Sequence, residues 1–480
     1  MTDDGLGLED AYGATLDRIK RQGEEKARLG MAALMWISHA EPHFRADELC
    51  HALAVEIGSP NLSTDNVPSI GTLLDCCQGL VVLERKASTV RLIHFTLQEY
   101  LRAHPRIFPA AHKKIAETCL TYLNSQQVKA ILASRSPDVQ HTPFLEYSSL
   151  YWGVHAKRDF SDCAKLLALK LFNDYDRHIS TKFLLIAQNL WGVDVHEFSG
   201  FSGLHCASFF GIVEIVASLL EIEGCDINKM DFTGSTPLLW ASRSGHEGVV
   251  KMLLGRDGIR SDEPNVNGET PLHVAAWFGH EEVLKMLLGH GVNPDKSNLR
   301  DQTPLCLATR TGKEEVVKLL LEQDGVNPEN QSIYGTPLYD AAQLGHEGVV
   351  KILLGRDDVN PNKPDNYGRT PILSAAYHGH QGVVKILLGR DDISPDKPNI
   401  DGRAPLWWAA RDGHEGIVKM LLAQDVSPDK PDKAGQTPLF WAIENGHKGV
   451  IALLQPPRSA TPTRSLPRRH IARFSPFYRR

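Results

Sequence analysis

Histidine is the residue type in this chain whose spacing most strongly invites a chemical explanation, because imidazole binds zinc and transfers protons near neutral pH. Six histidines recur 33 or 34 residues apart, with one step of 66, and each directly follows a glycine. A zinc site needs three or four ligands around a single ion. Residues that occur once per repeated unit do not converge on one ion, so we assign them to the repeat and expect neither a metal nor another cofactor. They are His246, His280, His346, His380, His414 and His447.

The short motifs of common enzyme chemistry are absent from the sequence. It contains no GxxxxGKS/T phosphate loop, no GxSxG nucleophile elbow, no HExxH zinc motif and no GxGxxG dinucleotide fingerprint. The eight cysteines form no CxxC pair, and Cys76 and Cys77 are adjacent in a predicted helix, where core packing explains them. We therefore predict a protein that is not an enzyme and that lies in a reducing compartment.

The histidines belong to a repeated unit whose clearest mark is a proline. A proline recurs every 33 or 34 residues, and a glycine follows it eight residues later. A threonine before the proline supplies an N-cap, the proline fits the first helical position, and the glycine ends the helix. A second apolar segment follows at helical spacing, so the period predicts a solenoid of stacked helix pairs. The prolines are Pro237, Pro271, Pro304, Pro337, Pro371, Pro405 and Pro438.

Some units depart from this pattern. Asp301 and Tyr334 stand where other units have a turn glycine, and Ala404 replaces the capping threonine, so we expect looser turns there. An earlier unit has Gly203 in place of the proline, 34 residues before Pro237. Counting this unit, we predict eight repeats over residues 198–455, the first of them degenerate.

The repeat resembles a known family. Residues 268–294, GETPLHVAAWFGHEEVLKMLLGHGVNP, read almost as the consensus of the ankyrin repeat. The resemblance implies a mainly α protein in which helix pairs stack into a solenoid that binds protein partners.

Two positions of the predicted first helix vary most between units, which leaves them available to a partner. They are the fourth and seventh residues from the proline, three apart and therefore on one helix face, so stacked units would form a concave strip. Trp, Tyr and Arg are typical of interface hot spots. The alternative is that the tryptophans fill grooves between repeats, but Asp340 and Ser374 share their position and favour partial exposure. The predicted partner-binding residues are Trp240, Arg243, Trp277, Arg310, Tyr377, Trp408, Arg411 and Trp441.

The first 200 residues show no such period. Apolar residues at helical spacing over 27–57 predict two helices with a turn at Glu41-Pro42. A third helix over Ile70 to Cys77 and two strands, Leu80 to Leu83 and Val90 to Ile93, complete a winged-helix arrangement. We predict an N-terminal helical segment over 1–26, a winged-helix-like domain over 27–105 and a helical connector over 106–197.

This region also resembles a family. WISHAEPHFRADELCHALAVE, CCQGLVVLE and VRLIHFTLQEYL resemble the winged-helix segment that follows the NACHT domain in fungal NACHT–ankyrin (STAND, NLR-like) proteins. That segment is also labelled the winged helix of a GPI inositol-deacylase. The resemblance implies a histidine that senses nucleotide phosphate, here His94, and it draws attention to Tyr100. Because the chain has no nucleotide-binding domain, a histidine that caps the following helix is the simpler interpretation.

These features predict a non-enzymatic scaffold that binds protein partners in intracellular signalling. Nucleic-acid binding through the winged helix and the C-terminal tail is the alternative, although residues 79–105 supply only Arg85, Lys86, Arg91 and Arg102 as fixed cations. A role in a lipid-hydrolase complex is suggested by the family label alone.

The remaining expectations concern the tail and the location. Residues 456–480 contain seven arginines and no acidic residue, so we predict a disordered basic tail on a chain whose net charge is −6. No apolar run reaches the roughly 18 to 20 residues that span a bilayer. We therefore expect no membrane contact and a cytoplasmic location, with the nucleus as a second possibility.

Overall fold

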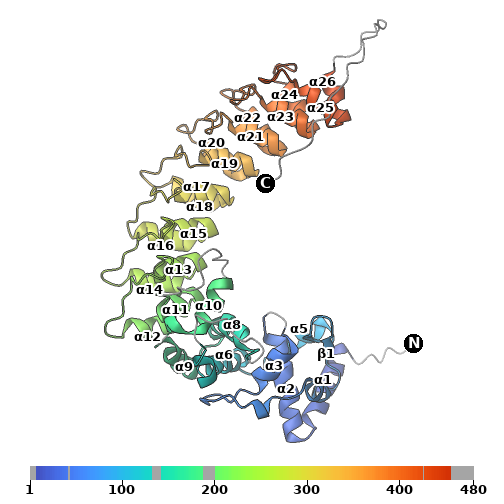
Figure 1. The fold of residues 1–480 in the computed structure, drawn as a ribbon, viewed down its shortest axis with the longest axis vertical. Coiled ribbons are helices and arrows are strands. Elements are labelled where there is room, and N and C mark those ends of the chain that lie inside the picture. The colour runs from blue at the N-terminus through green and yellow to red at the C-terminus, as the bar shows by residue number, and fades with distance from the viewer. Residues whose placement is uncertain are drawn as a thin grey trace, which may run out of the picture. The chain divides into compact units, whose positions relative to one another are not determined.

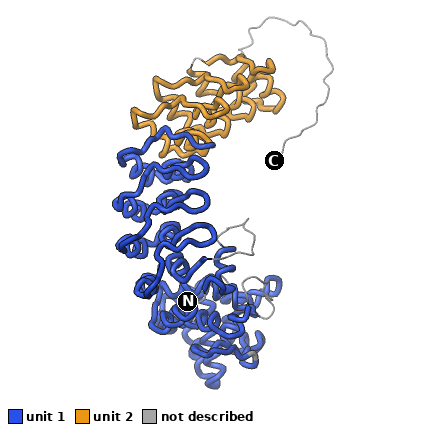
Figure 2. Tube along the Cα trace, turned by 60° about the vertical axis from the view of Figure 1, so that its left-hand side comes forward, with its two compact units in different colours: residues 1–333 blue, residues 334–480 orange. Residues whose placement is uncertain are grey.

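The computed structural model describes residues 7–41, 44–131, 142–173, 175–187, 200–424 and 426–455. It divides into two compact units, residues 1–333 and 334–480 (Figure 2). The predicted tail over 456–480, Pro42 of the predicted turn and the predicted boundary at 197 and 198 lie outside the described residues. Among the described residues, no helix combines the length and the apolar character needed to cross a bilayer.

The winged-helix arrangement predicted near the N-terminus is confirmed. The third helix and the two strands lie within one residue of their expected bounds, and the strands pair in antiparallel register, with Val81 opposite Leu92 and Leu83 opposite Val90. An isolated bridge between Arg45 and Thr89 joins this hairpin to the start of a helix. The elements are α1 (Leu8–Lys20), α2 (Glu24–His39), α3 (Ala46–Leu53), η1 (Thr64–Asn66), α4 (Ile70–Cys76), β1 (Val81–Glu84), β2 (Thr89–Leu92) and α5 (Phe95–Ala103), shown in blue in Figure 1.

The core of this region consists of the apolar side chains that share one face of each helix. Leu34, Leu49, Leu73 and Leu97 come from four different helices and are all buried. Cys76 and Cys77 are buried among them, which confirms that they are core residues. Burial also raises the pKa of the Cys77 thiol to about 12, so this sulfur stays protonated and unreactive.

A second group of helices connects the winged helix to the repeats. Helix α6 packs against both α8 and α9. Trp152 of α8 is fully buried, and its ring lies 5.9 Å from Phe172 of α9 and 5.1 Å from Phe210 of the first repeat. The aromatic contacts make the connector and the first repeat one packed body. The elements are α6 (Ala111–Leu123), α7 (Gln126–Lys129), α8 (Leu145–Arg158), α9 (Asp162–Phe172), η3 (Tyr175–Arg177) and α10 (Ile179–Ala187).

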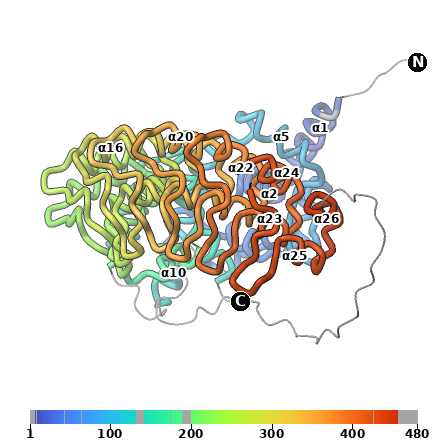
Figure 3. Tube along the Cα trace, turned by 90° about the horizontal axis from the view of Figure 1, so that it is seen from above, coloured from blue at the N-terminus to red at the C-terminus, as the bar shows by residue number. Residues whose placement is uncertain are grey.

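The described residues after 199 form eight helix pairs, which confirms the predicted mainly α solenoid. Within each unit of the structure, the first helices of successive pairs pack against one another and so do the second helices (Figures 1 and 3). The first helices are α11 (Gly203–Phe210), α13 (Pro237–Ser244), α15 (Pro271–Phe278), α17 (Pro304–Arg310), α19 (Pro337–Leu344), α21 (Pro371–His378), α23 (Pro405–Asp412) and α25 (Pro438–Glu444). The second helices are α12 (Val213–Leu220), α14 (Glu247–Leu254), α16 (Glu281–Gly289), α18 (Glu314–Leu321), α20 (Glu347–Leu354), α22 (Gln381–Leu388), α24 (Glu415–Leu422) and α26 (Lys448–Leu454).

The helix signals found in the sequence act as expected. The hydroxyl of Thr370 accepts the N–H of Leu373, and Gly379 ends the same helix in the left-handed region at φ +80°. Ala404 makes no side-chain cap, although α23 still begins at the next residue. The loosening expected at Asp301 is wrong, because this residue itself adopts φ +55° and its N–H still bonds to the Asn298 oxygen at 3.0 Å.

Candidate protein-interaction surface

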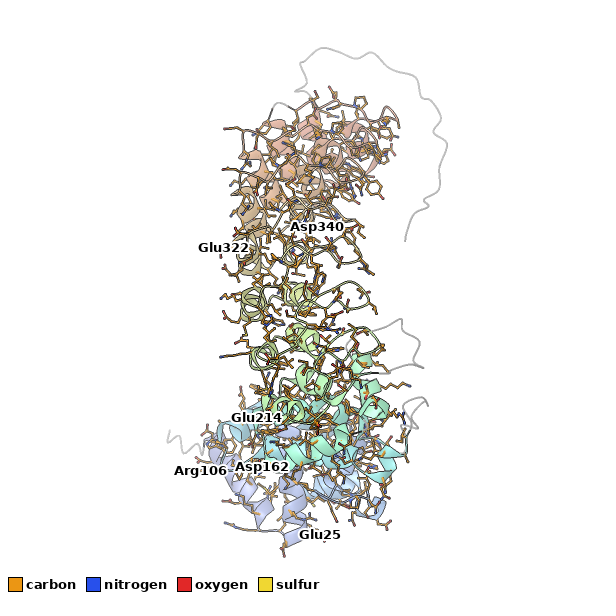
Figure 4. All side chains as sticks on the ribbon, turned by 90° about the vertical axis from the view of Figure 1, so that its left-hand side faces the viewer. Glu25, Arg106, Asp162, Glu214, Glu322 and Asp340 are labelled. Carbon is orange, nitrogen blue, oxygen red and sulfur yellow. The ribbon has the colours of Figure 1, made fainter. Side chains whose placement is uncertain are left out.

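The fourth position of the first helix is mostly buried. Trp240 is only 2% exposed, and Asp340 (labelled in Figure 4) and Ser374 are also buried. The Trp240 ring lies 5.5 Å from Phe201 and 5.8 Å from Phe209 of the preceding repeat. Its indole N–H donates to Oδ2 of Asp231 at 2.8 Å. The expectation of partial exposure is therefore wrong at Trp240, which fills a groove between repeats; Trp408 and Trp441 are half-buried.

The seventh position is more accessible. Trp277 is 41% exposed on α15, and Arg243, Arg310, Tyr377 and Arg411 are half-buried. The seventh residue is the last or next-to-last residue of its helix, whereas the fourth lies in the middle of the helix. The predicted strip therefore presents its seventh-position residues to solvent more than its fourth-position residues.

In residues 334–455, three of the predicted residues form one packed cluster. The rings of Tyr377 and Trp408, from successive first helices, lie 4.7 Å apart. The guanidinium carbon of Arg411 lies 4.3 Å from the centre of the Trp408 ring and 5.4 Å from that of Tyr377. Both Nε and Nη2 of Arg411 also donate to the carboxylate of Asp412, at 2.8 and 3.0 Å. The arginine is held in place by a charge on one side and by π systems on the other.

A residue that sequence reasoning missed links Trp441 to this cluster. The buried Trp407 lies 4.9 Å from Trp408 and 5.6 Å from Trp441, and its indole N–H donates to the Gln436 oxygen at 3.1 Å. The guanidinium of Arg403 lies 4.6 Å from the Trp407 ring. The two adjacent tryptophans were a visible signal in the sequence. Only the stacking of repeats places the Trp407 ring between those of Trp408 and Trp441.

In residues 1–333, the predicted residues are less closely associated. Arg243 lies over the Trp240 ring at 5.9 Å and over the Phe278 ring at 5.1 Å. Burial lowers the pKa of the Arg243 guanidinium, but it stays charged. Trp277 lies beside Phe278 in the sequence of α15, and Arg310 is the last residue of α17. The structure thus brings Trp240 and Arg243 together in this unit.

The repeated histidines donate hydrogen bonds to the main-chain oxygen of the seventh-position residue in the preceding repeat. His280 donates from Nε2 to the oxygen of Arg243 at 3.1 Å, and His414 does the same to Tyr377 at 3.2 Å. The histidine ring occupies the space that a side chain on the preceding repeat's glycine would fill. The interpretation that these histidines belong to the repeat is confirmed. Among the described residues, no group of three or more His, Cys, Asp or Glu is placed to hold a metal ion.

Each compact unit has an exposed apolar row at the turns that precede its first helices, and sequence reasoning did not identify it. Its members each follow the Asn, Asp or Ser that opens the turn, or come one residue later. In residues 1–333 they are Val266, Leu299 and Ile333, which are 60%, 77% and 54% exposed. In the second unit they are Tyr367 and Ile400, which are 59% and 53% exposed. The signal in the sequence was an apolar residue at a turn position where polar residues are usual.

Main-chain hydrogen bonds hold this row in place. The N–H of Val266 donates to the Thr233 oxygen and that of Leu299 to the Asn267 oxygen, both at 2.9 Å. In the second unit, the N–H of Ile400 donates to the Tyr367 oxygen at 3.1 Å. Because the turns are bonded to one another, their apolar side chains remain outside the core at fixed positions.

Comparison with known proteins identifies the repeats. The model described as "Ankyrin repeats (3 copies)" matches residues 154–264, 204–298, 258–332, 325–399 and 389–464, which is more than half of the chain. The chain belongs to the ankyrin-repeat family. Ankyrin repeats are protein-interaction modules and are typically not catalytic.

Two further comparisons concern the N-terminal region of this ankyrin-repeat chain and a solved ankyrin structure. The model "GPI inositol-deacylase, winged helix domain" matches residues 17–107. The crystal structure of the human ASB11 ankyrin repeat domain is similar at 25% identity, with a TM-score of 0.43, over 47% of this chain and 100% of that domain. No curated protein matches the sequence.

The winged helix of this ankyrin-repeat protein contains the histidine that drew attention in the sequence. His94 is the N-cap of α5, where its Nδ1 accepts the N–H of Thr96 at 3.3 Å. The Thr96 hydroxyl also lies 2.8 Å from that of Tyr12. The ring of Tyr100, further along the same helix, lies 5.7 Å from that of Tyr12 and 4.4 Å from that of His104. The interpretation of His94 as a helix cap is confirmed.

Proposed function

We propose that the chain is a non-enzymatic recognition scaffold of the NACHT–ankyrin signalling type, which acts in the cytoplasm and binds protein partners on the concave face of its repeats. The observation that carries this proposal is the cluster of Tyr377, Trp408 and Arg411. Aromatic and arginine side chains account for much of the binding energy in protein interfaces. Trp277, Arg243, Arg310 and Trp441 extend the same kind of surface to other repeats.

The cluster suits binding because it is ordered before a partner arrives. Arg411 is fixed by Asp412 and by two aromatic rings, so it loses little side-chain freedom on association. The exposed apolar row supports the proposal, since rows of apolar side chains on a folded surface often mark interaction sites. Main-chain bonds between the turns keep this row ordered as well.

Three arginines of residues 334–455, among them Arg411 of the cluster, are already paired with carboxylates, which favours a protein partner over a nucleic acid. Arg369 pairs with Asp365, Arg403 with Asp432 and Arg411 with Asp412. Binding along a phosphate backbone depends on cations that release counterions, and a guanidinium already paired with a carboxylate contributes little to it.

A capture experiment with a matched control tests the proposal. Trp277, Arg310, Tyr377 and Arg411 would be changed together to alanine, which we expect to leave helical circular dichroism and the unfolding midpoint nearly unchanged because all four are at least partly exposed. Recovery of partners from an extract of the native cells should collapse. The control replaces four exposed lysines of the second helices by alanine and should retain the partners: Lys251, Lys285, Lys351 and Lys385.

A second variant set tests the apolar row alone. Val266→Ser and Leu299→Ser should change the free energy of unfolding by at most about 0.5 kcal/mol, because both side chains are mostly exposed. Weaker partner recovery would assign the row to the binding surface. Full partner recovery by the serine variant would show that the apolar row is not part of the binding surface. If the quadruple alanine variant folds and still recovers its partners, the proposed helix surface is contradicted.

A further inference from the structure

A cavity of about 450 Å³ lies where the winged helix meets the helical connector. Its walls come from the end of α2, the end of α5, the start of α6 and the end of α8. The chemistry in these walls comes from His39, Arg102, His112 and Arg158, with Glu41 and Asp159 as the carboxylates. None of these residues belongs to the repeat surface described above.

Two guanidinium groups reach the cavity from different helices. Arg102 lines the cavity and donates from Nε to the main-chain oxygen of Ser38 at 2.7 Å, a bond that leaves its two terminal nitrogens for other acceptors. Arg158 donates from Nη2 to Oε1 of Glu41 at 2.7 Å, and both of these side chains are about two-fifths exposed. An exposed pair of this kind is weak and can be replaced by another anion.

A chain of hydrogen bonds runs from Tyr147 through His155 to His112. The Tyr147 hydroxyl accepts the N–H of Glu41 at 3.4 Å and lies 2.9 Å from Nε2 of the fully buried His155. The two Nδ1 atoms of His155 and His112 lie 2.8 Å apart. When Tyr147 donates to His155 and His155 donates to His112, the remaining proton of this chain of bonds lies on His112. His112 then carries its own proton on Nε2, the nitrogen that this chain of bonds leaves free for the cavity.

The start of α6 adds main-chain donors to the same cavity. Ala110 is its N-cap, at φ +59°, and makes no side-chain cap, while Ala110, Ala111 and His112 all line the cavity. The first N–H groups of a helix have no partner within the helix, and the helix dipole favours an anion beside them. This helix is 13 residues long, and it supports a site that the guanidiniums and His112 already define.

The fixed charges of the cavity wall are those of Arg102, Arg158, Glu41 and Asp159, so its positive charge is local to the two arginines. Burial, followed by the charges of Arg158 and His39, lowers the pKa of His112 to about 4, and Glu41 opposes this effect. The pKa of His39 is also lowered, first by burial and then by Arg102 and Arg158, against a hydrogen bond to the Met35 oxygen. Both imidazoles are therefore neutral at pH 7, and the fixed positive charges belong to the arginines.

We propose that this cavity binds a small phosphate-class oxyanion, either inorganic phosphate or the phosphoryl group of a small metabolite. The terminal nitrogens of Arg102, the Nε2–H of His112 and the first N–H groups of α6 would donate to its oxygens. Arg158 would exchange Glu41 for the anion. Since the donors come from both the winged helix and the connector, the bound anion would brace that junction against separation.

Titration calorimetry of the full chain with inorganic phosphate, sulfate and glycerol phosphate tests this site, with chloride at equal ionic strength as the reference. Arg102→Gln and Arg158→Gln should each weaken binding by about tenfold or more, since each removes a charge-assisted donor. Glu41→Gln should strengthen binding by about twofold to fivefold, because Arg158 loses its competing partner. Arg91→Gln, an exposed arginine on β2, should leave the affinity unchanged.

The proton on His112 supplies a second readout that a purely structural role would not give. Sulfate keeps its two charges between pH 4 and 8, so its binding should raise the pKa of His112 in nuclear magnetic resonance spectra and should tighten as the pH falls. Binding of phosphate but not glycerol phosphate would assign the free ion, and binding of both would assign the phosphoryl group. Affinity equal to that of chloride, or unchanged in both arginine variants, would overturn the proposal.

Discussion

His447 donates its Nε2–H to the main-chain oxygen of Arg411 at 2.9 Å, and so ties the last described repeat to the loop end of the repeat before it. The ring fits there because Gly413 has no side chain, and a Cβ atom on that glycine would lie 2.5 Å from His447 Nδ1. Gly413 also adopts φ +79°, a region that other residues enter only with strain. The glycine thus has two functions, ending its helix and accommodating the next repeat.

Gly413→Ala should therefore destabilise the repeats more than the same change at Gly446. Both glycines lie in the left-handed region just after a first helix, a conformation that costs an alanine about 1 to 2 kcal/mol. A side chain on Gly446 would meet nothing within 4 Å, whereas one on Gly413 would meet the His447 ring. Urea unfolding should show a larger loss for Gly413→Ala. Equal losses would mean that the histidine contact contributes nothing.

Ala404→Thr should stabilise the protein. Ala404 is the N-cap of α23 without a side-chain bond, and the equivalent Thr370 accepts the N–H of Leu373. A threonine hydroxyl at this position should accept the N–H of Trp407 and add about 1 kcal/mol to the free energy of unfolding. The measurement is the urea midpoint, with Thr370→Ala as the reverse change, which should lower it. No gain at Ala404 would show that its N-terminal turn differs from the others.

Acid should destabilise the repeats through their buried histidines. Burial lowers the pKa of His273 to about 4, against the hydrogen bond to the Gln302 oxygen. Because the folded-state pKa lies below the ordinary value of about 6.5, the stabilisation is complete above pH 6.5 and is lost as the pH falls toward 4. By pH 5 this residue should account for a loss of about 2 kcal/mol.

The matched variant for this test is His273→Gln, which keeps a donor and does not titrate. Its unfolding free energy should fall less than that of the original protein between pH 7.5 and pH 5, and the difference measures the contribution of His273. The same fall in both proteins would assign the acid sensitivity to other groups.

Leu353→Ala should cost about 2 to 5 kcal/mol, because Leu353 is fully buried in α20 between neighbouring helices. Leu454→Ala should cost less, because Leu454 is the last residue of α26 and is 6% exposed, whereas Leu353 is fully buried within α20. Chemical unfolding of the two variants compares them directly. A larger loss at Leu454 would mean that the packed stack continues beyond this helix.

The local structure of this chain could be read from its sequence. Thr370, Gly379 and their equivalents act through hydrogen bonds and backbone angles of their own helix, so the helix starts and ends follow from residue type alone. The hairpin at Val81 to Leu92 was predictable for the same reason, as was the role of His94 as a cap. The family resemblance of the repeats rests on these same local signals.

The exposure of the fourth-position side chains was decided by the tertiary structure. Trp240 is buried because Phe201 and Phe209 stand in the preceding repeat, while Trp408 at the same position meets Tyr377 and stays half-buried. The polar Asp340 and Ser374 are buried as well, so polarity at this position did not indicate exposure. The cavity of Arg102, His112 and Arg158 likewise joins residues far apart in the chain. The local sequence determines a helix because its bonds join residues a few positions apart. The burial of a side chain depends instead on which side chains of the neighbouring element pack against it.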